Sequence, residues 1–465
     1  MLFNSFIFLG LALTTLLLYY LPLFRHLQVK LLIVASLLFY AYELPALVLL
    51  LLFSVAINTS VSYYVLFGKP ANKKPLATLG VAVNLAILAF FKYSPLVAHT
   101  FFNPGDDMAR FLLTIPLPIG ISFFTFEGIS LVVDLYQNKF YSPEEIKGLS
   151  FSKHAERTLF FVSFFPHLVA GPILKAHDFL PQIGRKYFHD IDWTAAFKYL
   201  VVGYFLKMVV ADNLKDFTFW IAFPYYQNFS SLTLLTMLFG YSMQIFADFA
   251  GYSAIAIGLG KLFGYTLQEN FNFPYIATSF KEFWKRWHIS LSTFLMEYLY
   301  IPLGGNRKGK VRTYLNLIIT MLLGGLWHGA AWSYALWGLL HGAALALEKL
   351  AGYDRPRRHV AALMAQGLLV FTFVTLAWLL FKLPQFSDVI GFMRSVAHNT
   401  AMPADIKNIA GILVYSLPVV GYHAYHVLRP ALPRVRQVEY LTYGVLLFLI
   451  LVNSGSSGTF IYFQF

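Results

Sequence analysis

Long apolar segments recur along the whole chain, and they constrain its fold more than any other feature. A helix needs about 20 apolar residues to cross the roughly 30 Å hydrocarbon core of a bilayer. Segments that meet or approach this length are predicted near residues 5–22, 28–41, 44–66, 77–95, 112–136, 193–212, 230–258, 313–327, 330–349, 360–382, 409–427 and 437–453. The first lacks a basic leader and an Ala-x-Ala cleavage site, so we interpret it as a retained span rather than a signal peptide. The sequence therefore predicts an all-α polytopic membrane protein with about 11–12 transmembrane helices.

The composition excludes several other classes of protein. Only 12% of the 465 residues are charged, against about 25% in soluble domains, and 58% are apolar. The mean hydropathy of +0.62 is too high for an ordinary cytosolic enzyme or a disordered chain. The chain has no cysteine, which excludes a disulfide-stapled fold, a catalytic thiolate and a metal site built from thiolates.

The basic charge of the chain follows its predicted membrane topology. The 35 Lys and Arg against 22 Asp and Glu give a net charge of +13, a balance that in a soluble protein would suggest nucleic acid. Here the basic residues gather in alternate loops. Lys69, Lys73 and Lys74 follow the third predicted span, whereas Asp106 and Asp107 follow the fourth. Because cytoplasmic loops are enriched in Lys and Arg, we predict extracytoplasmic N- and C-termini and no nucleic acid partner.

Two stretches do not fit a simple span. Residues 158–173 are apolar but lie between basic loops and are interrupted by proline and glycine, which predicts a re-entrant segment. Residues 270–312 combine Lys and Arg with Phe and Trp, which is typical of a helix lying in the cytoplasmic interface. No repeat or separate soluble domain is evident, so residues 1–453 are predicted to form one transmembrane domain.

Four ionisable side chains lie in or beside apolar segments, where such groups are costly and functional by default. His328 ends an apolar segment that starts near Arg312, which puts it about 22 Å into the bilayer at 1.5 Å per residue. A neutral imidazole there can take a proton from a hydroxyl, as a general base must, although a purely structural histidine fits the position equally well. His288 lies among aromatic residues, Asp248 has no charged neighbour in sequence, and the position of His341 favours packing.

The sequence offers no template for a metal site or a serine hydrolase. It contains no Gly-x-Ser-x-Gly, no His-Glu-x-x-His and no phosphate-binding glycine loop. Pairs of histidines on one helical face are absent too, so no metal is expected. The glycines at positions 324, 325 and 329 around His328 would instead let the backbone bend and a substrate approach closely.

Two histidine-centred motifs are the most specific part of the sequence. They read FWKRWHISLSTFLMEYLYIPLGGNRKG at 283–309 and LGGLWHGAAWSYALWGLLHG at 323–342. Further motifs are PLPIGISFFTFEGISLVVDLY at 116–136, FFPHLVAGPI at 164–173 and FADFAGYSAIAIG at 246–258. Together they cover the region from about 110 to 345. This region resembles the membrane-bound O-acyltransferase (MBOAT) family, and more narrowly its bacterial branch for alginate O-acetylation, peptidoglycan O-acetylation and teichoic acid D-alanyl transfer.

The resemblance implies a helical bundle that encloses a tunnel from the cytoplasmic face, with His328 as the catalytic histidine and His288 as the second signature histidine. It implies no covalently bound cofactor and an acyl donor that is acetyl-CoA or the phosphopantetheine thioester of a carrier protein. Further residues of these motifs are expected to contact the donor or line the tunnel: Asp248, Lys285, Arg286, Trp287 and Trp327. The chain departs from relatives at Ala250 and Ala254, which stand where they carry Ser and a second Asp.

Residues 454–465 are predicted to form a flexible extracytoplasmic tail. The stretch NSGSSGT has the composition of a flexible linker, and FIYFQF follows it. Phe460, Tyr462 and Phe465 match the Phe-x-Tyr-x-x-Phe tail that this branch uses as a transient acyl acceptor, and that a small separate protein carries in the teichoic acid system. A disordered end without function is the alternative interpretation.

These features lead to the hypothesis of a transmembrane acyl relay. A cytoplasmic thioester would dock on the basic face at 281–312, and His328 would act as general base toward the hydroxyl of Tyr462. His288 would orient the donor or assist proton movement. An extracytoplasmic acyltransferase partner would pass the acyl group, most simply acetyl, to a polysaccharide. The resemblance places such a protein in the bacterial cytoplasmic (inner) membrane, surrounded by membrane lipid. The alternatives are D-alanyl transfer to teichoic acid, a transporter or flippase, and a non-catalytic scaffold.

Overall fold

The computed structural model describes residues 1–42, 44–103, 105–169, 171–352, 359–428, 436–456 and 458, and in these ranges the regular structure is helical, without a strand. Two compact units can be distinguished. The first comprises Met1–Leu200 with Ser253–Gln268, and the second comprises Val201–Tyr252 with Glu269–Phe465. The boundary passes through two long helices, α11 (Trp193–Tyr204) and α13 (Ser231–Leu262).

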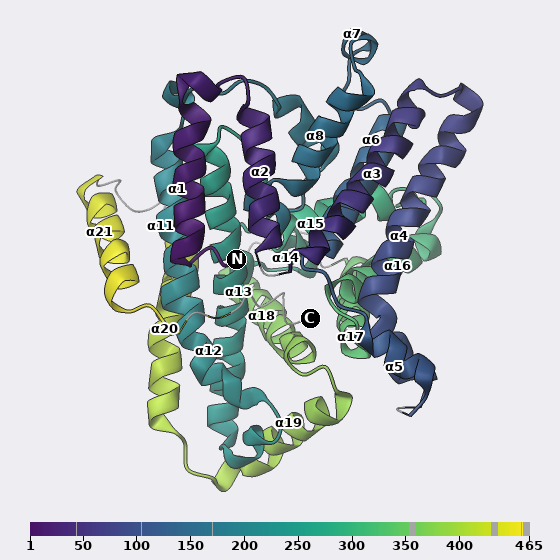
Figure 1. Cartoon of the computed structure of the whole chain (residues 1–465). Coiled ribbons are helices and arrows are strands. Elements are labelled where there is room, and N and C mark those ends of the chain that lie inside the picture. The colour runs from purple at the N-terminus through teal and green to yellow at the C-terminus, as the bar shows by residue number, and fades with distance from the viewer. Residues whose placement is uncertain are drawn as a thin grey trace. The chain divides into compact units, whose positions relative to one another are not determined.

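In the first unit α3, α4 and α6 pack against one another and lie side by side in Figure 1, and α2 and α8 both contact α3. The helices that begin in this unit are α1 (Phe6–Tyr20), α2 (Gln28–Ala41), α3 (Ala46–Phe67), α4 (Pro70–Phe101), α5 (Asp107–Thr114), α6 (Ile121–Tyr136), α7 (Pro143–Lys147), α8 (Phe151–Ser163), α9 (Phe165–Leu168), α10 (Ala176–Phe179) and α11.

In the second unit α16 and α17 form a closely packed pair, α18 packs on α17, and α12 packs on α20. A π-helix, η4, continues α11 and contacts both α20 and α21. Besides α13 and several short 3-10 helices, the elements of this unit are η4 (Phe205–Ala211), α12 (Asp212–Thr218), α14 (Phe280–Arg286), α15 (Ile289–Leu295), the π-helix η8 (Met296–Tyr300), α16 (Lys310–His328), α17 (Trp332–Leu350), α18 (Val360–Lys382), α19 (Phe386–His398), α20 (Ile406–Leu428) and α21 (Arg436–Val452).

The prediction of an all-α polytopic membrane protein is confirmed. Each predicted apolar segment contains a helix, and large apolar side chains such as Phe6, Leu49 and Leu369 are exposed on helix surfaces, as lipid-facing residues would be. Within the described ranges, five helices are long and apolar enough to cross a membrane by length and composition: Ala46–Phe67, Pro70–Phe101, Trp193–Ile221, Ser231–Leu262 and Val360–Lys382. Shorter apolar helices lie at Phe6–Tyr20, Gln28–Ala41 and Gln437–Val452.

The predicted span at 112–136 is broken rather than continuous, which corrects the sequence interpretation. α5 ends at Thr114 and α6 begins only at Ile121. Ile115, which precedes Pro116, is extended with φ −68° and ψ 116°, and Gly120 has a left-handed backbone with φ of 78°. Average hydropathy registers only that these residues are apolar, so it predicts a continuous span. The backbone preferences of the prolines and of Gly120 interrupt the helix.

Residues 158–173 contain the break that their proline and glycine content predicts. α8 ends at Ser163, and α9 is a short helix starting at Phe165. Phe160 to Leu168 are almost completely buried within the first unit, which is where interrupted backbone is tolerated at membrane depth. The re-entrant path of this segment through a bilayer stays a prediction.

Buried polar pairs connect the helices of the first unit. His167 Nε2 of α9 lies 2.7 Å from Glu127 Oε1 of α6, and both side chains are fully buried. Two helical turns further along α6, Asp134 accepts hydrogen bonds from the ring and the backbone N–H of His177 and pairs with Lys139 at 2.9 Å. Each of these two buried carboxylates thus has a histidine or lysine side chain beside it.

Candidate active site

The second unit brings His288 and His328 together, although forty residues separate them in sequence. Their ring centroids lie 6.0 Å apart, and their residues are 0% and 4% exposed. His328 is the last residue of α16, and Gly329 continues in an extended conformation. His288 stands between α14 and α15 with a left-handed backbone, φ 44° and ψ 56°. A non-glycine residue in this conformation is strained, and such residues cluster at functional sites.

The predicted single interfacial helix over 270–312 is therefore wrong. The segment forms two short helices, α14 and α15, that are separated by Trp287 and His288, and a π-helix follows them. A mixture of basic and aromatic residues indicates an interfacial segment, but it carries no signal for the left-handed residue that divides it.

Asn270 fixes the orientation of His288, and sequence analysis missed this residue. Its side-chain oxygen lies 3.3 Å from His288 Nδ1 and accepts hydrogen bonds from the N–H and the hydroxyl of Ser290. Because an amide oxygen can only accept, the bond to His288 requires the proton on Nδ1 and leaves the lone pair on Nε2. Burial lowers the pKa of His288 to about 3, so the imidazole is neutral at physiological pH. His288 can therefore accept a proton or a hydrogen bond at Nε2.

Aromatic rings enclose the two histidines. Trp327, Trp337 and Phe381 lie with ring centroids 5.1 to 5.4 Å from that of His328. The ring of Phe249, from α13, meets His288 edge to face at 4.6 Å. A buried aromatic environment of this kind is poor in water and suits a neutral imidazole that acts as a base.

Two of the glycines around His328, Gly325 and Gly329, allow close packing on α17, and the approach of a substrate to this backbone stays a prediction. A Cβ atom at Gly325 would overlap the carbonyl oxygen of Tyr334, and one at Gly329 would overlap the Tyr334 ring. From the other side, a Cβ atom at Gly338 would overlap the carbonyl oxygen of Met321. Small residues thus allow α16 and α17 to approach closely, as in other membrane helix pairs.

This close approach gives a prediction for Gly338. Substitution Gly338→Ala should force α16 and α17 apart, which displaces His328 at the end of α16 and costs roughly 1–3 kcal/mol of stability. Thermal unfolding in detergent and acyl transfer rates would measure both effects. Gly421→Ala is the matched control, because this helical glycine has open space around it. Equal behaviour of the two variants would contradict the proposed packing role.

The other predicted donor and tunnel residues have different surroundings. Trp287 is buried and stacks on Phe283 at 5.6 Å with an interplanar angle of 15°. Trp327 is buried with its ring 6.0 Å from that of His288. Arg286 forms an ion pair with Glu282 at 2.8 Å, whereas Lys285 is exposed. Tyr462 lies outside the described residues, so its proximity to the histidines stays a prediction.

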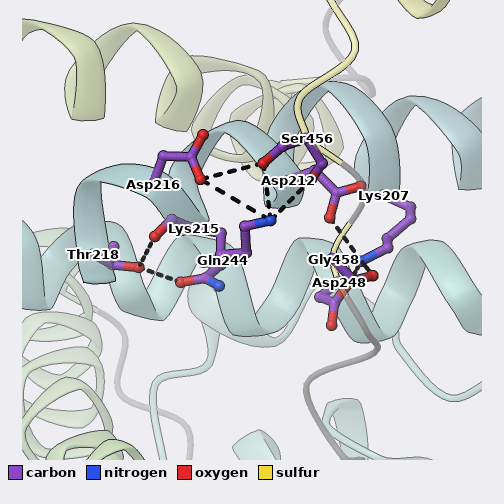
Figure 2. A network of polar contacts seen from close by, with 9 residues as sticks. All are labelled: Lys207, Asp212, Lys215, Asp216, Thr218, Gln244, Asp248, Ser456 and Gly458. Atoms are coloured by element: carbon purple, nitrogen blue, oxygen red, sulfur yellow. Dashed lines mark hydrogen bonds and ion pairs between the residues drawn. The ribbon is translucent and has the colours of Figure 1, made fainter. Parts of the chain in front are cut away.

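Asp248 is part of a buried ion cluster. Lys207 Nζ of η4 donates hydrogen bonds to Asp248 Oδ1 at 2.7 Å and Asp212 Oδ1 at 2.8 Å, and all three side chains are at most 4% exposed (Figure 2). Sequence analysis missed Lys207, which lies 41 residues from Asp248. The available signal was a lysine inside a predicted span, which is costly without a partner. Phe249, the next residue on α13, contacts His288.

The helical membrane fold is the one expected for an acyltransferase of the MBOAT class. The family model for the membrane-bound O-acyltransferase family matches residues 154–383, which include both histidines. The chain belongs to this family.

Curated relatives are similar over most of the chain. The "Probable alginate O-acetylase AlgI" of Pseudomonas putida is 40% identical over 395 residues, 82% of this chain and 77% of the relative. The "Peptidoglycan O-acetyltransferase" of Helicobacter pylori is 36% identical over 81% of this chain and 74% of the relative. The "Teichoic acid D-alanyltransferase" of Bacillus subtilis is 27% identical over 65% of this chain and 75% of the relative.

Proposed function

We propose that this protein relays an acetyl group from a cytoplasmic thioester through the membrane, for O-acetylation of an extracytoplasmic polysaccharide. The observation that carries the proposal is the buried pair of His288 and His328, 6.0 Å apart inside an aromatic shell. A neutral histidine base in a water-poor site suits acyl transfer to a hydroxyl, because water would otherwise hydrolyse the activated acyl group.

In the proposed reaction the imidazole of His328 takes the proton from the hydroxyl of Tyr462. The phenol oxygen attacks the thioester carbonyl carbon, the carbon–sulfur bond breaks, and the proton passes to the departing thiolate. His288, held by Asn270 with its lone pair on Nε2, would orient the donor or assist this proton transfer. The product is a tyrosyl ester that a partner acyltransferase on the outer face can deliver to a polysaccharide hydroxyl.

Acetyl-CoA or an acylated carrier protein is the proposed donor. Exposed Lys285 on α14 offers a positive charge to the phosphates of either donor, while Arg286 is held by Glu282. Acetyl is favoured over D-alanyl because the relatives named as O-acetylating proteins are 36–40% identical to this chain, against 27–28% for the D-alanyltransferases. We propose a bacterial inner-membrane location, as the resemblance implies, with both termini outside the cytoplasm, as the loop charges predict.

Labelled donor tests the relay directly. Incubation of the purified protein with isotope-labelled acetyl-CoA should add the mass of one acetyl group to the peptide that contains Tyr462, as measured by mass spectrometry. Tyr462→Phe keeps the ring and removes only the acceptor oxygen, so it should abolish both the labelled peptide and polysaccharide acetylation. Full polysaccharide acetylation by Tyr462→Phe would contradict the tyrosyl relay.

A further inference from the structure

The start of the C-terminal tail is docked along η4 and α12. We define residues 453–456 and 458 as the docked segment. Its backbone makes several hydrogen bonds to these two elements, some of which appear in Figure 2. Gly455 N–H donates to Met208 O at 2.9 Å, Asn213 Nδ2 donates to Asn453 O at 3.0 Å, and Lys215 Nζ donates to Ser456 O at 2.9 Å. A linker that merely tethered two parts would not need these contacts.

Lys207 couples the docked segment to the buried carboxylates. Besides Asp212 and Asp248, its ammonium group donates to the carbonyl oxygen of Gly458 at 3.2 Å. An ammonium group has three N–H donors, and these three acceptors use all of them. A hydrogen bond from a buried lysine to the tail backbone is stronger than one from an exposed lysine, because water does not compete for it.

Position 455 has room for glycine but not for a residue with a side chain. A Cβ atom there would lie 2.6 Å from Asp212 C and 2.7 Å from Asn213 N, both backbone atoms of α12 that cannot move independently. The glycine therefore allows the tail backbone to lie directly on the first turn of α12, next to the carboxylate that pairs with Lys207.

The docked segment ends close to the residues that pack on His288. Gly458 and Asp248 bond to the same Lys207 ammonium, and Phe249, the neighbour of Asp248, contacts the His288 ring at 4.6 Å. Tyr462 follows Gly458 by four residues, which can extend at most about 14 Å. The docked segment thus anchors the tail four residues before Tyr462.

We propose that Lys207, Asp212, Asp248 and Gly455 are positioning residues that dock the C-terminal tail and deliver Tyr462 to the active site. This inference rests on the proposed tyrosyl relay. The buried cluster acts on the tail backbone and does not touch the reacting atoms. By holding the tail backbone in place, the cluster shortens the part of the tail that can move freely. This raises the effective concentration of the Tyr462 hydroxyl at the base.

Gly455→Ala tests the docking, and Gly444→Ala on α21 is its control because the space around Gly444 is open. The chain has no cysteine, so a single pair can be introduced at Asp216 and Ser456, whose side chains are 3.4 Å apart. Oxidation of Asp216→Cys/Ser456→Cys should give a disulfide in the parent background and in Gly444→Ala. In Gly455→Ala we expect the equilibrium constant for docking to fall about tenfold, the change that corresponds to a moderate overpacking cost, and disulfide formation to slow accordingly.

Acylation separates positioning from general damage to the fold. With labelled acetyl-CoA, Gly455→Ala should lose acylation of its own Tyr462 but acylate a free peptide of residues 459–465 at the parental rate. A structural lesion would slow both reactions. Parental acylation of Tyr462 by Gly455→Ala, or undiminished cross-linking in that variant, would overturn the positioning role. If the parent acylates neither its own tail nor the peptide while cross-linking still depends on Gly455, the relay fails and the docking stands.

Discussion

Replacement of His328 by glutamine is expected to slow acyl transfer by about 10²–10⁴-fold, the usual contribution of a positioned general base. Glutamine keeps most of the side-chain volume among Trp327, Trp337 and Phe381, so the aromatic shell should persist. It cannot take up a proton, so the acceptor hydroxyl loses its base. His328→Ala should have the same kinetic effect and a larger loss of stability, because it leaves a cavity in the shell. The rate of labelled acetyl transfer measures the first effect and thermal unfolding measures the second.

His341→Gln is the matched control for this prediction. His341 is also a fully buried histidine of the second unit, with its ring 4.7 Å from Trp337 on the same helix. It packs among aromatic rings and does not contact His288 or His328 in the structure, so its loss should cost stability and leave transfer nearly unchanged. Full transfer by His328→Gln would favour a transporter or a scaffold over an acyltransferase relay.

The substitution Lys207→Met is expected to cost about 3–5 kcal/mol of stability, the range for removing one partner of a buried ion pair. Methionine has a similar length but no charge, so Asp212 and Asp248 would remain buried without the ammonium that lies 2.8 and 2.7 Å from them. Thermal unfolding in detergent, followed by tryptophan fluorescence, would show this as a large decrease in Tm.

The triple variant Lys207→Met, Asp212→Asn, Asp248→Asn separates charge from packing. It removes all the charges together, and replacing a whole buried ion cluster by neutral groups is often close to neutral for stability. We expect it to regain most of the Tm that the single substitution loses. If Lys207→Met is as stable as the triple variant, the burial of the two carboxylates does not depend on the charge of Lys207.

Helix positions in this protein follow from local sequence, whereas the site depends on long-range contacts. Apolar length predicted a helix at every proposed span, because crossing a bilayer requires it. The breaks at Ile115–Gly120 and at His288 were missed, since both depend on backbone conformations that hydropathy does not register. The 6.0 Å approach of His288 and His328 is consistent with the resemblance, but spacing alone did not predict it.

Lys207 and Asn270 show what sequence analysis cannot supply. Each acts on a residue far along the chain. A lysine inside a predicted span indicates that Lys207 needs a buried partner but does not identify that partner, and no local pattern around Asn270 points to His288. Lys207 also lies in the π-helix η4, which places Asp212 five residues later within 2.8 Å of its ammonium. In an α-helix the partners would be expected three or four residues away, so a search at helical spacing passes over this pair.

Asp248 and Phe249 are consecutive on α13, and side chains of neighbouring helical residues point about 100° apart. One is held by Lys207 and the other packs on His288. Together these two contacts set the rotation of α13 about its own axis. A substitution at Asp248 that turns the helix by a few degrees moves the Phe249 ring against His288 without any change in the chemistry of the site. A lower transfer rate in an Asp248 variant should therefore be compared with the rate in a Lys207 variant. Both variants break the same ion pair and so change the same rotation of α13.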